Sequence, residues 1–125
     1  MSEADHQAAL MRWARTQEAT VPELKMLFCI ANGGYALSKA SAWHLKQRGV
    51  RPGVPDLCLA VARGGYHGLY VEMKDEDPKK TRTSPEQKAW IEALRRHGYA
   101  AIVCLGWIAA KTKIERYLAL LPPTP

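Results

Sequence analysis

Three charged residues in the middle of the chain have the types and the spacing that phosphodiester hydrolysis needs. Asp56 follows a Gly-Val-Pro turn, and Glu72 and Lys74 lie near the end of the apolar segment "GLYVEMK". Side chains two residues apart on a strand share a face, so Glu72 and Lys74 point the same way, roughly 6–7 Å apart. If the segment after Asp56 pairs with "GLYVEMK" in a hairpin, all three side chains meet at one edge of the sheet.

Two carboxylates and one ammonium group at a single point suit metal-dependent chemistry. Carboxylate oxygens bind a hard cation such as Mg²⁺, which keeps several of its waters. The metal stabilises charge on a phosphate and lowers the pKa of a bound water, while a nearby lysine orients the attacking water. The alternative is that the Glu-x-Lys pair is an ordinary solvated strand face, and the pair alone does not decide between the two.

The overall charge favours a polyanionic partner. The chain has 125 residues, a formal net charge of +6 and a pI of about 9.4. An excess of this kind indicates nucleic acid first and an anionic membrane surface second. No apolar run approaches the ~18 residues of a membrane-spanning helix, so we expect no membrane partner.

The cysteines and the N-terminus bear on the compartment. Cys29, Cys58 and Cys104 are far apart, odd in number and set in apolar segments, which predicts buried thiols in a reducing environment. Residues 1–5 have no basic stretch followed by an apolar one, so no signal peptide is predicted. We therefore expect a cytoplasmic protein, in a bacterial or phage-infected cell.

The periodicity of apolar residues predicts the element order αβαββαβα. Asn32-Gly33-Gly34 is a turn signal, and a Gly-rich connection at 63–67 is short enough for a hairpin. Ser84 and Pro85 form a helix start. Helices are predicted over residues 3–18, 38–49, 85–97 and 107–121, and strands over residues 23–30, 55–62, 68–74 and 99–106.

These elements predict an α/β fold with a mixed four-stranded sheet flanked by helices on both faces. Strand 68–74, helix 85–97 and strand 99–106 form a βαβ unit with parallel strands. Strand 99–106 is nearly all apolar, as a central parallel strand should be. We expect a single domain over residues 1–125 that ends in a short Pro-rich tail, 122–125.

Five stretches in this order resemble the VRR-NUC (virus-type replication-repair nuclease) domain of the PD-(D/E)xK nuclease superfamily. They are "NGG", "GVPDLCL", "RGGYHGLYVEMK", "SPEQKAWIEALRRHGY" and "VCLGW", and the resemblance covers about residues 3–120. It implies a restriction-endonuclease-like core of the kind found alone in phages and bacteria.

The resemblance also implies roles for the charged residues of the hairpin. Asp56 and Glu72 match the metal-binding acids of the family, with Asp56 in the most direct contact. The carbonyl of Met73 would complete the coordination of Mg²⁺ or Mn²⁺. Lys74 matches the catalytic lysine.

The family further has an acid on its first helix, followed by a Gln one turn later. Glu3 and Gln7 fit this spacing and would share a helix face. Asp5 is an alternative register, and an acid here is also simply favourable for the helix dipole. Gln87 matches a Gln that is often near such active sites, against the plainer interpretation that it faces solvent.

Basic residues near the hairpin are candidates for gripping DNA phosphates. They fall on either side of the proposed site, and the plainer interpretation is a solvated mobile loop. The candidates are Lys79, Lys80 and Arg82 after the catalytic strand, and Arg48 and Arg51 before Asp56.

The sequence thus predicts a metal-dependent, structure-selective DNA endonuclease with a role in DNA repair. The resemblance favours a homodimer that cuts four-way (Holliday) junctions in branched DNA, with no small-molecule cofactor beyond Mg²⁺ or Mn²⁺. The alternatives are a flap or 5′-end nuclease and a DNA-binding module of the same fold that has lost catalysis.

Overall fold

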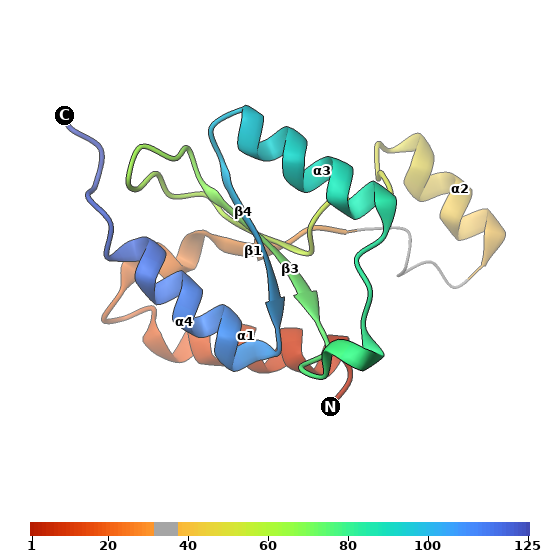
Figure 1. Ribbon diagram of the computed structural model, residues 1–125, viewed down its shortest axis with the longest axis horizontal. Coiled ribbons are helices and arrows are strands. Elements are labelled where there is room, and N and C mark those ends of the chain that lie inside the picture. Colours follow the sequence, from red (N-terminus) through yellow and green to blue (C-terminus); the bar gives the residue numbers. More distant parts are fainter. Residues whose placement is uncertain (32–37) are drawn as a thin grey trace.

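A four-stranded mixed sheet lies between helices on both of its faces in the computed structural model, which describes residues 1–31 and 38–125 (Figure 1). The predicted turn at Asn32-Gly33-Gly34 lies outside the described residues. None of the helices in these ranges is long and apolar enough to cross a membrane. The elements are α1 (Glu3–Gln17), η1 (Pro22–Met26), β1 (Leu27–Cys29), α2 (Lys39–Gln47), β2 (Leu57–Leu59), β3 (Leu69–Lys74), η3 (Pro78–Lys80), α3 (Pro85–Arg96), β4 (Ala100–Leu105) and α4 (Trp107–Leu118).

The sheet has the strand order β1-β2-β3-β4. The β2–β3 pair is the predicted antiparallel hairpin, with Leu57 opposite Val71. The β3–β4 pair is parallel, as the βαβ unit predicts. The prediction that the last strand is central is wrong, because β4 is an edge of the sheet formed by the described residues. Because β4 is an edge strand, its apolar residues Val103 and Leu105 are exposed.

The hairpin between β2 and β3 closes at the Gly-rich connection. Arg63 and Tyr66 form a β-bridge, and Gly64 and Gly65 between them have φ of 58° and 85°. Two successive positive φ values are typical of the type I′ turn that matches the twist of a hairpin. The Tyr66 ring lies 6.3 Å from that of Tyr117, so the tip packs against α4 at the end of the hairpin opposite the charged residues.

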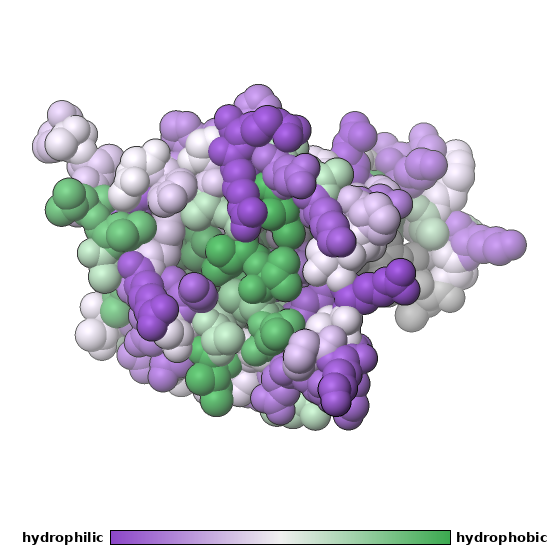
Figure 2. Space-filling view, in the orientation of Figure 1, coloured by the Kyte–Doolittle hydropathy of each residue, from purple (hydrophilic) through white to green (hydrophobic). Residues whose placement is uncertain are grey.

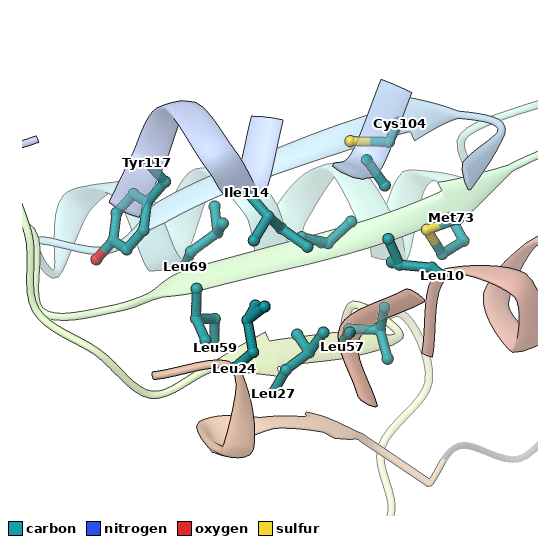
Figure 3. Packing of buried hydrophobic residues seen from close by; sticks show 13 residues of the cluster. Leu10, Leu24, Leu27, Leu57, Leu59, Leu69, Met73, Cys104, Ile114 and Tyr117 are labelled. Atoms are coloured by element: carbon teal, nitrogen blue, oxygen red, sulfur yellow. The ribbon is translucent and has the colours of Figure 1, made fainter. Parts of the chain in front are cut away.

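One face of the sheet carries the main core beneath α1 and α4 (Figure 3). Leu10 from α1 and Ile114 from α4 are fully buried against side chains of the strands. Each buried Leu, Ile or Val stabilises the fold by about 1.5–3 kcal/mol. Val71 and Met73 of β3 point into this core, as expected. The alternate residues of β3 therefore face the opposite side, toward α3.

The opposite face is covered by α3. Ile91 and Leu94 of this helix pack on Ala101 of β4. The helix begins as the sequence predicts, with Ser84 as its N-cap and Pro85 in its first position. Because α3 packs here, its N-terminal turn lies over the end of β3 that carries the charged residues.

A buried histidine joins the two helices on the first face. His6 of α1 is 2% exposed, and its Nδ1 accepts a hydrogen bond from the backbone N–H of Trp107 at 3.1 Å. This contact caps the start of α4, whose own N-cap is Gly106 and offers no side chain. The arrangement fixes the N-terminal half of α1 against the C-terminal end of the sheet.

The first predicted strand is much shorter than its apolar sequence suggests. Residues Pro22–Met26 form a 3₁₀ turn, and only Leu27–Cys29 pair with β2. Pro22 explains this, because its fixed φ suits the first position of a helical turn. The prediction of three buried thiols holds for Cys58 and Cys104 but is wrong for Cys29, which is exposed on this short edge strand.

Candidate active site

Asp56 meets the end of β3 at one edge of the sheet. It directly precedes β2, and its Oδ2 accepts a hydrogen bond from the backbone N–H of Met73 at 2.7 Å. On β3, Lys74 Nζ lies 3.7 Å from Glu72 Oε2, and both side chains are almost fully buried. The predicted hairpin geometry therefore brings Asp56, Glu72 and Lys74 together.

Gln87 from α3 completes this cluster. Its Nε2 donates to Glu72 Oε2 at 3.2 Å, and its Oε1 accepts from Lys74 Nζ at 3.0 Å. The amide therefore links the carboxylate and the ammonium group directly. Of the two interpretations of Gln87, the structure places it at the site and not on a solvent-facing surface.

Ser84 fixes the orientation of that amide, and sequence reasoning assigned it only a cap. Its backbone N–H donates to Gln87 Oε1 at 2.8 Å, and its hydroxyl accepts from the Gln87 N–H at 3.1 Å. This is a reciprocal capping box. The signal was present in the sequence, since a Ser three residues before a Gln predicts that the Gln side chain folds back toward the helix start.

The pKa of Glu72 is raised from an ordinary value of 4.5 to about 8. Burial is the largest cause, followed by the negative charge of Asp56 and a hydrogen bond to it; Lys74 opposes the shift without cancelling it. Burial and a like charge both disfavour the ionised form. A positive charge placed between the two carboxylates would relieve this cost.

The carbonyl of Met73 faces the same edge as Asp56. Within a strand, the N–H and C=O of one residue point to the same side, as they do in hydrogen-bonded antiparallel pairs. The Met73 N–H points to Asp56, while the carbonyl of the next residue, Lys74, accepts from Gly106 on the β4 side at 2.9 Å. Met73 therefore offers a carbonyl oxygen beside the Asp56 carboxylate.

The acids at the start of α1 separate into two environments. Asp5 belongs to the helix cap, because its Oδ2 accepts from the Ser2 N–H at 2.9 Å. Glu3 lies toward the hairpin: its Oε1 accepts from Thr81 Oγ1 at 3.5 Å, and its charge contributes to the raised pKa of Glu72. Glu3, and not Asp5, is therefore the acid of α1 that faces the cluster.

The predicted partner of Glu3, Gln7, lies one turn further along α1. Its Nε2 contacts Cys29 Sγ of β1 at 3.3 Å. Ile30, the residue after that edge strand, donates its N–H to the Asp56 carbonyl at 2.8 Å. The Gln7 side chain therefore connects α1 to the segment that ends beside Asp56.

The oxygen donors of the cluster fit a divalent cation that keeps most of its own waters. Asp56 and Glu72 supply carboxylates, and Met73 supplies a carbonyl. Within residues 1–31 and 38–125 no three His, Cys, Asp or Glu side chains converge closely enough to hold a metal, so Glu3 does not complete a three-acid group. Few protein ligands and hard oxygen donors are typical of Mg²⁺ sites.

The basic loop after β3 lies beside the cluster. Lys79 and Lys80 are exposed in η3, whose first turn is capped by the Asp77 side chain. Arg82 is exposed two residues later. The contact of Thr81 with α1 holds this loop near the carboxylates. The three predicted cations are therefore exposed on a loop that contacts α1 at Glu3, and their role in holding phosphates stays a prediction.

The other predicted basic residues, Arg48 and Arg51, precede Asp56 in the chain. Arg48 ends α2 and Arg51 follows it, and both are exposed. The turn after them packs closely on α3, because a Cβ at Gly53 would lie 2.6 Å from the Glu86 backbone. This close approach fixes the segment that leads to Asp56.

Comparisons with known proteins agree on one group. A family model described as the VRR-NUC domain matches residues 1–107, which include every residue of the cluster. A solved structure described as a VRR_NUC domain protein is 29% identical, with a TM-score of 0.81 over 98% of this chain and 92% of that chain. No curated protein matches the sequence.

Proposed function

Because the chain belongs to the VRR-NUC family, whose fold is that of a DNA-processing nuclease, we propose that it is a metal-dependent endonuclease acting on branched DNA. The observation that carries this proposal is the convergence of Asp56 and Glu72 with Lys74 at one sheet edge. A buried carboxylate beside a second carboxylate and a buried ammonium group costs stability and is typical of functional sites.

Asp56, Glu72 and the Met73 carbonyl are the groups that would hold Mg²⁺ or Mn²⁺. Such an ion stabilises charge on the scissile phosphate and lowers the pKa of a bound water. The raised pKa of Glu72 supports this assignment, since a cation would favour the ionised carboxylate. Glu3 is proposed to act at longer range, through water, because it lies outside the immediate carboxylate pair.

Lys74 is proposed to orient the attacking water and to stabilise negative charge on the phosphate. Its ammonium group is held by Gln87 at 3.0 Å and lies 3.7 Å from Glu72, so its position is restrained before substrate binds. A preorganised donor in a water-poor site stabilises the transition state more than a mobile surface lysine would. Gln87 is therefore proposed as the residue that positions Lys74.

Substrate selection is proposed to depend on DNA shape. The exposed basic residues of two separate segments, at 48–51 and 79–82, would contact phosphates. Phosphate contacts fix the register of the protein on DNA but carry no sequence information directly. A branched substrate offers two directions of backbone to two separate basic segments, which a straight duplex does not.

The proposed assembly is a homodimer that packs through the exposed edge of the sheet. Apolar side chains gather over β4 between α3 and α4 in Figure 2, and the exposed ones are Val103, Leu105 and Ile108, here called the β4 patch. An unpaired apolar edge strand is a ready surface for association. A two-fold contact uses the same surface on both copies, and no charge in this patch would oppose it.

A cleavage assay tests the proposal. Wild type and Lys74→Ala would be given labelled four-way junction, flap, splayed-arm and duplex DNA with Mg²⁺, Mn²⁺ or EDTA. Paired, metal-dependent nicks in the junction that the variant does not make would support the dimeric nuclease. Cutting of flaps alone would keep the chemistry and remove the junction assignment. Binding without cutting under either metal would contradict the enzymatic function.

A further inference from the structure

Helix α2 lies apart from the sheet, beyond the N-terminal end of α3 (Figure 1). It buries none of its residues, and Leu45 is the one side chain of this helix that is even partly buried. Isolated helices shorter than about 12–15 residues are only marginally stable in water. With nine residues and so little packing, α2 has an outward face that a partner would stabilise.

The outward face of α2 carries two lysines with a tryptophan between them. Lys39, Trp43 and Lys46 stand at positions i, i+4 and i+7, so they follow one stripe of the helix. Leu45 lies on the opposite side. All three residues of the stripe are exposed, and Trp43 is 58% exposed. We call these three residues the α2 stripe.

Trp43 differs from the other tryptophans in its surroundings. Trp13, Trp90 and Trp107 are partly buried and pack against the two apolar clusters of the fold. The ring of Trp43 instead meets that of its neighbour His44 edge-on, with 5.1 Å between the ring centroids. Exposed indoles contribute strongly to binding where a partner covers them. Trp43 is therefore suited to an interface and not to the core.

The charge of this segment favours a polyanion. No Asp or Glu occurs from residue 24 to residue 55. Lys39 and Lys46 form no ion pair within residues 1–31 and 38–125. In a two-fold contact between copies, the same lysines would face each other and repel. A membrane-bound helix needs a broad apolar face, and the α2 stripe offers one apolar ring. Phosphates of DNA match this combination of unpaired cations best.

The C-terminal end of α2 is tied to the candidate active site. Asp56 follows Gln47 by nine positions, so even a fully extended chain would end α2 within about 32 Å of Asp56. The connection is packed on α3, because a Cβ at Gly53 would lie 2.6 Å from the backbone of Glu86. This reach is about one turn of B-DNA, ~34 Å. Away from its branch point a branched substrate is duplex, so the DNA that reaches α2 is a duplex arm.

We propose that the α2 stripe docks a duplex arm of the DNA substrate within about one helical turn of the cleavage site. Lys39 and Lys46 contact phosphates, and the Trp43 ring packs on the deoxyribose between them. The inference rests on the proposed nuclease function and adds to it a contact that lies away from the chemistry. An acidic protein surface is the rival partner, and the short connection between α2 and Asp56 favours DNA.

The test measures binding apart from cleavage. The probe is a fluorescein-labelled four-way junction in EDTA, titrated with wild type and with Lys39→Gln/Lys46→Gln over a range of salt concentrations. Each phosphate contact to duplex DNA contributes about 0.9 to the slope of log affinity against log salt. The variant should lose about 1.8 from that slope and bind about tenfold more weakly at ~0.1 M salt.

A matched variant separates the α2 stripe from general charge. Lys113→Gln/Arg116→Gln removes two exposed cations from α4, across the molecule from α2 (Figure 1). Charges that lie more than about 10 Å from the DNA are largely screened at ~0.1 M salt. The α4 variant should therefore bind the junction within about twofold of wild type.

Trp43 reports on the contact directly, because its indole is the one that is mostly exposed. Junction DNA should protect the tryptophan fluorescence of wild type from quenching by acrylamide. Trp43→Leu keeps an apolar side chain but removes the ring, and DNA should no longer change the quenching of this variant. It should bind the junction about fivefold more weakly with an unchanged salt slope, because no charge is lost. Its midpoint of urea unfolding should match that of wild type, since Trp43 is not part of the core.

The outcomes also separate this inference from the nuclease proposal. If wild type cuts DNA and both the lysine and Trp43 variants bind and cut like it, the α2 assignment is wrong and the nuclease stands. If wild type binds but never cuts, while the lysine variant loses binding, the α2 assignment stands and the nuclease falls. Equal loss of binding in the α4 variant would overturn the α2 assignment. Stronger protection of Trp43 by polyglutamate or by vesicles of anionic lipid than by duplex DNA would overturn it too.

Discussion

Gln87 and Lys74 are joined by a hydrogen bond of 3.0 Å between Oε1 and Nζ, and the same Gln87 amide oxygen accepts from the N-cap of α3. One side chain therefore begins a helix and restrains the candidate catalytic lysine. The position of Lys74 depends on whether the first turn of α3 is formed, so stability of the helix start and activity are linked at this point.

The two roles of Gln87 can be separated by substitution. Gln87→Glu keeps a capping-box side chain but faces Glu72 with a carboxylate where an amide donated at 3.2 Å. We expect its free energy of unfolding to fall by about 1 kcal/mol while its single-turnover cleavage rate falls at least about tenfold. Ser84→Ala should cost about 1 kcal/mol of stability with a smaller loss of rate. A Gln87→Glu protein that cuts at the wild-type rate would remove Gln87 from the site.

Lys74 should be needed for the chemical step and not for DNA binding. Lys74→Met keeps most of the buried stem but removes the ammonium group, so cleavage should fall by about 10²–10⁴-fold. The affinity for junction DNA, measured by fluorescence anisotropy in EDTA, should change by less than about twofold. Lys88→Met, an exposed position one residue after Gln87, is the control and should cut normally. Wild-type cleavage by Lys74→Met would show that the site is assigned to the wrong residue.

The pKa of Glu72 predicts how stability depends on pH when metal is removed. Its folded-state pKa of about 8 exceeds the ordinary 4.5, so the folded protein holds this proton more tightly than the unfolded chain. The resulting stabilisation is complete below about pH 4.5 and is lost as pH rises through about 8. Urea unfolding in EDTA should show a decrease of a few kcal/mol across this window. In Glu72→Gln the free energy of unfolding should depend much less on pH across this window. A variant with the same pH dependence as wild type would contradict the raised pKa of Glu72.

Asp56→Asn should abolish metal binding and make the metal-free protein more stable. The amide oxygen of Asn can still accept from the Met73 N–H, but the negative charge that raises the pKa of Glu72 is gone. Above pH 8 the metal-free variant should be more stable than wild type, by on the order of 1 kcal/mol. Isothermal titration should show that its Mn²⁺ binding is lost. A variant that is less stable and still binds Mn²⁺ would place the metal elsewhere.

The element order and the meeting of Asp56, Glu72 and Lys74 were predictable because they depend on local patterns. Hairpin spacing and strand alternation fix which side chains share an edge and a face. The edge position of β4 was not predictable, because an apolar strand is typical of a sheet centre and also of an edge that a partner covers. The prediction took the first case, but β4 lies at the edge of the sheet formed by the described residues and leaves Val103 exposed.

The β4 patch gives the prediction that bears on assembly. Ile108 is 64% exposed in the first turn of α4, outside the carboxylate cluster. Ile108→Glu puts an acid where the helix dipole favours one, so the single chain should remain folded. In a two-fold dimer the two new carboxylates would repel each other at the buried centre of the contact, and dimer affinity should fall at least about tenfold.

Sedimentation analysis over a concentration series measures this effect, with Leu121→Glu as the control because Leu121 is 81% exposed in the C-terminal segment. If the dimer acts on junctions, Ile108→Glu should also convert paired nicks into single, uncorrelated nicks while its per-site rate on a single branch changes little. A wild-type protein that sediments as a monomer at all concentrations would overturn the dimer. A dimer that Ile108→Glu leaves intact would instead move the contact away from β4, since a buried pair of like charges there could not be tolerated.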